Sequence, residues 1–148
     1  MDTVLIDGLS FALPLFIIAI GGIYSEKSGI TNLALEGFQG FGAFIGALSA
    51  VLIANAFGTD IQDLFYVALL FAMIGGMVFA VIHAVLCIKF KANQVISGVV
   101  INILALALTT FLTTQINALV FGTASDKFQL GVMERFTIAG LADIPVIG

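Results

Sequence analysis

Residues 21–37 read GGIYSEKSGITNLALEG and separate two segments that are otherwise almost entirely apolar. The stretch combines glycines with Glu26, Lys27 and Glu36. Glycine inside a helix costs about 1 kcal/mol relative to alanine, and a charge at the centre of a membrane helix costs about 2.5–3.5 kcal/mol. We therefore predict that one membrane helix ends, and the next begins, within these residues.

The first residues of this stretch predict the end of one helix, and its last residues predict the start of the next. We expect Gly21 and Gly22 to weaken the end of the first helix, and the connector to carry Lys27. Asn32 is a candidate N-cap for the second helix. Glu36 falls in the first turns of that helix, where the helix dipole stabilises a carboxylate by about 0.3–1 kcal/mol. Two interpretations of Glu36 stay open: a helix-start charge, or an interior group that fixes the connector or contacts a polar solute.

The composition predicts an integral membrane protein. Of 148 residues, 61% are hydrophobic and 9% are charged, and the mean hydropathy is +1.21. Soluble domains carry about 25% charged residues, so this chain cannot coat a water-exposed surface. The net charge of -4, with five scattered basic residues, also argues against a nucleic-acid partner, which needs clustered Lys and Arg.

Four charge-poor intervals are each long enough for one membrane helix, which needs about 20 apolar residues. We predict an all-α integral membrane protein, a polytopic helical bundle with about four transmembrane helices and an extramembrane tail. The expected spans are 5–24, 33–57, 64–88 and 94–121, and 122–148 is expected to be a loop leading to a helix that the chain lacks. Pro14 leaves two interpretations of the first span open: an ordinary kinked helix, or a discontinuous helix beside a transport path.

Small residues recur on one face of the second and third spans. Small side chains at a spacing of four let another helix approach closely, so we predict helix-packing faces in both spans. The residues expected to form them are Gly42, Gly46, Ala72, Gly76, Ala80 and Ala84.

The fourth span has a face that is polar or small along most of its length. At 100° per residue this face comprises Gln94, Gly98, Asn102, Ala105, Thr109 and Thr113. Polar groups in hydrocarbon need partners, so the face should look into the protein or into water. Interhelical hydrogen bonding and the lining of a solute pathway both stay open.

Titratable side chains are too sparse to build an enzyme site. The chain has one His, His83, and one Cys, Cys87, and none of the nucleophile, zinc or nucleotide-phosphate motifs. We expect His83 to be a hydrogen-bonded structural or interfacial residue, with a titrating role as the alternative, and the chain to hold no metal and no cofactor. Lys27, Lys89 and Lys91 share one side of the expected topology, so the positive-inside rule places that side in the cytoplasm and the N-terminus outside.

Three segments resemble one family of membrane permeases from bacterial ABC importers, which serves branched-chain amino acids, simple sugars and nucleosides. They are residues 21–37, ANQVISG at 92–98 continuing into NILAL at 102–106, and LADIPVIG at 141–148. The elements SEKSG and NLALEG look most like the nucleoside branch. Permeases of this family are longer, and the helix that contacts the ATPase lies in the half that this chain lacks.

The resemblance implies an N-terminal portion of a nucleoside or simple-sugar permease in the bacterial plasma membrane. Its implied partners are a second permease subunit or the missing C-terminal half, a cytoplasmic ATPase that uses the ATP, and an extracytoplasmic substrate-binding lipoprotein. Candidate substrate-pathway residues are Gln94, Asn102, Thr109, Thr113, Asn32 and Glu36. The alternative is a truncated membrane protein that does not transport and acts only in assembly or interaction.

Overall fold

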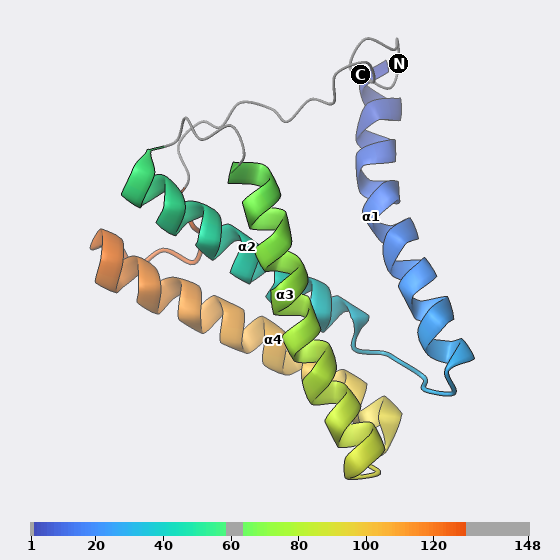
Figure 1. Ribbon diagram of the computed structural model, residues 1–148. Coiled ribbons are helices and arrows are strands. Elements are labelled where there is room, and N and C mark those ends of the chain that lie inside the picture. Colours follow the sequence, from blue (N-terminus) through green and yellow to red (C-terminus); the bar gives the residue numbers. More distant parts are fainter. Residues whose placement is uncertain (1, 59–63, 130–148) are drawn as a thin grey trace. The chain divides into compact units, whose positions relative to one another are not determined.

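The computed structural model describes residues 2–58 and 64–129, and every regular element in this part of the chain is a helix (Figure 1). The helices are α1 (Asp2–Lys27), α2 (Leu35–Phe57), α3 (Leu64–Ala84) and α4 (Gln94–Ile116). Single π-helical turns, η1 (Val85–Lys89) and η2 (Asn117–Phe121), extend α3 and α4. Four segments among the described residues are long and apolar enough to cross a membrane. The predicted all-α membrane architecture with about four spanning helices is confirmed.

A glycine with positive φ sets the end of α1. Gly29 has φ +85°, and its N–H donates to the carbonyl of Glu26 at 3.0 Å. The N–H of Ile30 donates to the carbonyl of Ser25 at 3.4 Å. These two bonds form the pattern that closes many helices on a left-handed glycine, so the helix ends at Lys27 and the chain turns away after it.

The helix continues through Gly21 and Gly22, and the prediction that Lys27 lies in the connector is wrong because Lys27 lies in the last turn of α1. The helix is also continuous across Pro14, which rules out a discontinuous first span. In an apolar environment an unmade backbone hydrogen bond costs several kcal/mol, which exceeds the cost of about 1 kcal/mol for a helical glycine.

Helices α2, α3 and α4 belong to one compact unit, in which α2 packs against both of the others (Figure 1). α3 runs antiparallel to α2, and α4 runs parallel to it. The rings of Phe41 on α2 and Phe79 on α3 stack with their centroids 4.1 Å apart. One cluster of buried apolar residues in this unit comprises Ala34, Phe79, Ile101 and Ala105.

Small residues bring the backbones of α2 and α3 into close contact. A Cβ atom added to Gly42 would lie 2.7 Å from the carbonyl oxygen of Ala72, and one on Gly46 would lie 2.9 Å from that of Ala68. A Cβ on Gly76 would lie 3.2 Å from the carbonyl oxygen of Phe38. Gly42, Gly46, Ala72 and Gly76 thus share one interface. Ala80 and Ala84, which follow on α3, are half-buried.

Candidate functional site

The polar face of α4 lies against α2, and its two ends make different contacts. We call residues 31–37 together with 94–102 the amide end, because side-chain amides join the two segments there. We call residues 40–47 together with 109–113 and 125–128 the threonine end. The two ends lie on the same two parallel helices, so they can be compared directly.

Asn102 joins α4 to the start of α2 through both atoms of its amide. Its Oδ1 accepts from the backbone N–H of Gly37 at 2.8 Å, and its Nδ2 donates to the carbonyl of Leu33 at 2.8 Å. One turn earlier, Gly98 lies so close that an added Cβ would be 2.9 Å from the Cβ of Leu33. The amide end is therefore closed both by hydrogen bonds and by packing.

Gln94 holds the connector one step further out. Its Oε1 accepts from the backbone N–H of Thr31 at 2.8 Å. Asn32 uses its Oδ1 to accept from the N–H of Ala34 at 2.9 Å, and Ala34 is the N-cap residue of α2, with no side-chain cap bond. The prediction that Asn32 caps this helix is thus wrong, because its oxygen closes a turn just before the helix begins. Glu36 is exposed in the first turn of α2.

His83 links α3 to the same end of α4. Its Nδ1 lies 3.0 Å from Oγ of Ser97, and both residues are buried. The ring of Phe38 meets the imidazole edge to face with centroids 5.8 Å apart, and Sγ of Cys87 lies 3.7 Å from Nε2. The expectation that His83 is hydrogen-bonded at a helix interface is confirmed. Among the described residues, no three His, Cys, Asp or Glu side chains gather to hold a metal ion.

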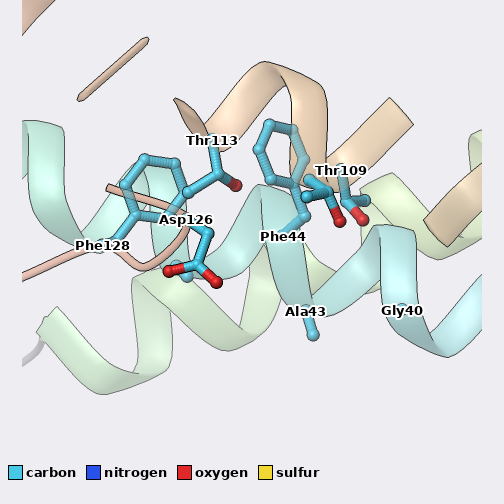
Figure 2. A pocket seen from close by; sticks show the side chains of 9 residues that line it. Gly40, Ala43, Phe44, Thr109, Thr113, Asp126 and Phe128 are labelled. Atoms are coloured by element: carbon cyan, nitrogen blue, oxygen red, sulfur yellow. The ribbon is translucent and has the colours of Figure 1, made fainter. Parts of the chain in front are cut away.

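The threonine end contains a pocket of about 270 Å³ between α2, α4 and the segment that follows η2. Figure 2 shows Gly40, Ala43 and Phe44 on α2, with Thr109 and Thr113 on α4 and Asp126 next to Phe128. The lining residues are Gly40, Ala43, Phe44, Ala47, Thr109, Thr110, Thr113, Asp126 and Phe128. The same two helices that the amides join at one end thus line an open pocket at the other.

The threonine hydroxyls do not bridge this gap because they bond to their own helix. Oγ1 of Thr109 donates to the carbonyl of Leu106 at 3.2 Å, and Oγ1 of Thr110 donates to the same carbonyl at 2.9 Å. Hydroxyls of Ser and Thr within helices commonly bond to the preceding turn in this way. Their hydrogens are used within α4, so their oxygens offer lone pairs to whatever occupies the pocket.

Asn117 positions the segment 125–128, which forms one side of the pocket. It is 2% exposed, and its Nδ2 donates to the carbonyls of Ser125 at 2.8 Å and Lys127 at 2.9 Å. The segment therefore folds back on η2 and brings Asp126 and Phe128 to the pocket. The rings of Phe128 and Phe44 lie with their centroids 5.9 Å apart.

The six candidate pathway residues divide between the two ends. Thr109 and Thr113 line the pocket, whereas Gln94, Asn102, Asn32 and Glu36 all lie at the amide end. The sequence did not predict the other seven lining residues, among them Phe44, Thr110, Asp126 and Phe128. Asp126 and Phe128 follow the last apolar span, and no pattern in the sequence predicts that the chain returns to α2 there.

Comparison with known proteins identifies the family. The family model described as the permease component of the branched-chain amino acid transport system matches residues 4–148. The chain belongs to this family. The predicted resemblance is confirmed over almost the whole sequence.

Two relatives in this permease family match nearly all of the chain. The guanosine ABC transporter permease protein NupQ of Bacillus subtilis is 39% identical over 140 residues, which is 95% of this chain and 42% of that protein. The nucleoside ABC transporter permease protein NupC of Lactococcus lactis is 32% identical over 151 residues, or 100% of this chain and 44% of that protein. The chain thus spans less than half the length of each.

The name of a third relative refers to a different solute. The putative glucose ABC transporter permease protein TsgC13 of Haloferax volcanii is 37% identical over 103 residues, covering 68% of this chain and 28% of that protein. No solved structure shows a significant match to the chain.

Proposed function

We propose that this chain forms the N-terminal portion of the membrane permease of an ABC importer for nucleosides or related ribose-containing solutes. The observation that carries the proposal is the extent of the similarity: 39% identity over 95% of this chain with a protein named as a guanosine permease. The next relative, named as a nucleoside permease, covers the full chain.

The geometry supports a route for a polar solute at one end of the molecule. Residues with hydroxyl and carboxylate groups line a cavity between helices that are long and apolar enough to span a membrane. Polar groups at such depth are costly unless they have partners or face water. Thr109 has one partner in the carbonyl of its own helix at Leu106, and a solute path would serve the lone pairs of its oxygen that remain. Bonds to the start of α2 satisfy the requirement at Asn102.

We place the amide end on the cytoplasmic side of the membrane. Lys89 and Lys91 lie beside this end, and the positive-inside rule favours the cytoplasm for such residues. The pocket then opens on the extracytoplasmic side of the bacterial plasma membrane. A substrate-binding lipoprotein would deliver the solute there, and a separate ATPase would hydrolyse the ATP in the cytoplasm. The remaining half of the permease, or a second permease subunit, would complete the path.

Uptake by living cells tests the function. The gene that encodes this chain is deleted, and uptake of tritiated guanosine is measured before and after the complete gene is restored. We expect guanosine uptake to fall to background and to recover on restoration, while uptake of tritiated leucine stays unchanged as a control.

Unchanged nucleoside uptake would contradict the proposed function. If guanosine and other nucleosides enter the deleted cells at the original rate, the chain does not transport them. A membrane protein that acts only in assembly or interaction would then account for its packing faces.

A further inference from the structure

The pocket at the threonine end is lined by hydrogen-bond acceptors. The hydroxyl hydrogens of Thr109 and Thr110 are donated to the carbonyl of Leu106, so both oxygens face outward as acceptors. Asp126 also lines the pocket, and an ionised carboxylate only accepts. A ligand that suits this wall must therefore bring hydrogen-bond donors.

The size of the pocket limits how much of a ligand it can hold. Its volume of about 270 Å³ lies just below the range of about 300–1,000 Å³ that is usual for drug-sized ligands. At about 30 Å³ for each water in the liquid, it corresponds to about nine waters. One five- or six-membered ring with its substituents fits this space. The pocket is open, since Ala43, Thr110 and Asp126 in its lining are exposed, so the rest of a nucleoside can extend outward.

Aromatic side chains supply the apolar part of the wall. Phe44 and Phe128 both line the pocket, and Gly40 and Ala43 leave the α2 side open because their side chains are minimal. A Cβ added to Gly40 would meet no atom within 4 Å. The pocket thus pairs a flat apolar surface with a row of acceptors, which matches a ring that has C–H groups on its face and hydroxyls on its edge.

We propose that this pocket binds the ribose ring of a nucleoside through its two neighbouring hydroxyls, which donate to Asp126 and Thr110 while the C–H face of the ring lies against Phe44. This inference rests on the proposed function and assigns the part of the solute that the permease itself reads. In this arrangement the base of the nucleoside lies outside the pocket, so the pocket distinguishes different sugars better than different bases.

The charge of the pocket separates nucleosides from nucleotides. Among the described residues that line the pocket, Asp126 is the only charged one. Its negative charge repels a phosphate group. The pocket therefore accepts neutral ribosides and disfavours their phosphates.

The chain offers a matched control for the threonine. Thr114 lies on the same helix and donates its hydroxyl to the carbonyl of Thr110 at 3.0 Å, the same kind of bond that Thr110 makes to Leu106. Thr114 does not line the pocket. Thr110→Val and Thr114→Val thus each remove one hydroxyl bond to the preceding turn of α4, and only the first removes an acceptor from the pocket.

The test measures ligand binding by the purified complete permease, assembled with its ATPase but without the binding lipoprotein. Dissociation constants come from thermal-shift titrations with guanosine, 2′,3′-dideoxyguanosine, guanine and guanosine monophosphate. We expect the wild-type permease to bind guanosine about a hundredfold more tightly than the dideoxy compound, because that compound lacks both hydroxyls and each hydrogen bond contributes about tenfold. Guanine and the monophosphate should bind more weakly than guanosine.

The variants locate the effect. Asp126→Asn and Thr110→Val should each weaken guanosine binding about tenfold and leave dideoxyguanosine binding unchanged, and Thr114→Val should bind both like the wild type. Equal losses for both ligands, equal effects of the two Thr→Val variants, or guanine binding as tight as guanosine binding would overturn the inference. If the wild type binds no guanosine while cells still take it up, this inference fails and the proposed function stands. If uptake also fails, both are wrong.

Discussion

The amide end and the threonine end lie on the same two helices. Hydrogen bonds and packing close the amide end, whereas the threonine end contains a pocket. At the amide end, Asn102 reaches both the N–H of Gly37 and the carbonyl of Leu33. At the threonine end, Thr109 and Thr110 bond only to Leu106 of their own helix, and a pocket of about 270 Å³ remains.

Side-chain reach explains this difference. The amides of Asn and Gln are long enough to bond to a neighbouring backbone, and they carry both a donor and an acceptor. A threonine hydroxyl sits on Cβ and finds the carbonyl of its own preceding turn first. A polar helix face can therefore be structural along one half and open along the other, and the type of polar residue decides which.

Replacing Asn102 should give the largest change in stability. Asn102→Leu leaves the Gly37 N–H and the Leu33 carbonyl without their partner, and one unsatisfied buried group costs about 1–3 kcal/mol. We expect the free energy of unfolding in detergent to fall by about 2–3 kcal/mol. Thr109→Leu is the matched variant, and it should cost less than about 0.5 kcal/mol because its hydroxyl bonds only within α4. Equal losses for the two variants would remove the distinction between the ends.

Two glycine substitutions compare the ends by packing alone. Gly98→Ala brings a Cβ to within 2.9 Å of the Leu33 Cβ, and overpacking costs about 1–3 kcal/mol, less about 1 kcal/mol from the better helix propensity of alanine. We expect a net loss of up to about 2 kcal/mol. Gly40→Ala meets no atom within 4 Å and should stabilise the fold by up to about 1 kcal/mol. Thermal unfolding of both variants checks the signs, and a stabilising Gly98→Ala would refute close packing at the amide end.

Gln94→Ala should have the smallest effect. It removes one exposed hydrogen bond, from the Thr31 N–H to Oε1, and a typical net value is about 0.5–1.5 kcal/mol. Gln115 lies exposed on the same helix, so Gln115→Ala serves as the control. Chemical unfolding of the two variants should separate them, and identical midpoints would show that Gln94 does not hold the connector.

Most of the fold could be predicted from the sequence because hydropathy sets it. The four apolar runs became four helical spans, since a long apolar run must satisfy its backbone internally. The helix ends were harder to predict. Helix α1 ends just before Gly29 and not at Gly21 or Gly22. Such an end needs a residue with positive φ, and carbonyls in the last turn that accept hydrogen bonds from the N–H groups that follow.

The site could be predicted only in part. The polar face of α4 was correctly located by its period, but periodicity cannot say which polar residues reach across to α2 and which turn back on their own helix. Asn102 and Thr109 looked equivalent in the sequence, and their hydrogen bonds separate them. Asp126 and Phe128 reach the pocket through Asn117, by a return of the chain that no local pattern announces.

Thiol labelling tests the central claim, that one polar helix face is closed at one end and open at the other. In a complete permease whose buried Cys87 is replaced by alanine, single cysteines are introduced as Thr109→Cys and Ala105→Cys, one turn apart on the same face. Ala105 is 2% exposed, whereas Thr109 lines the pocket. With a charged, membrane-impermeant reagent applied to vesicles of both orientations, we predict that the cysteine at 109 reacts much faster, from the extracytoplasmic side, and that guanosine slows it. Equal rates at the two positions, without an effect of guanosine, would contradict this account.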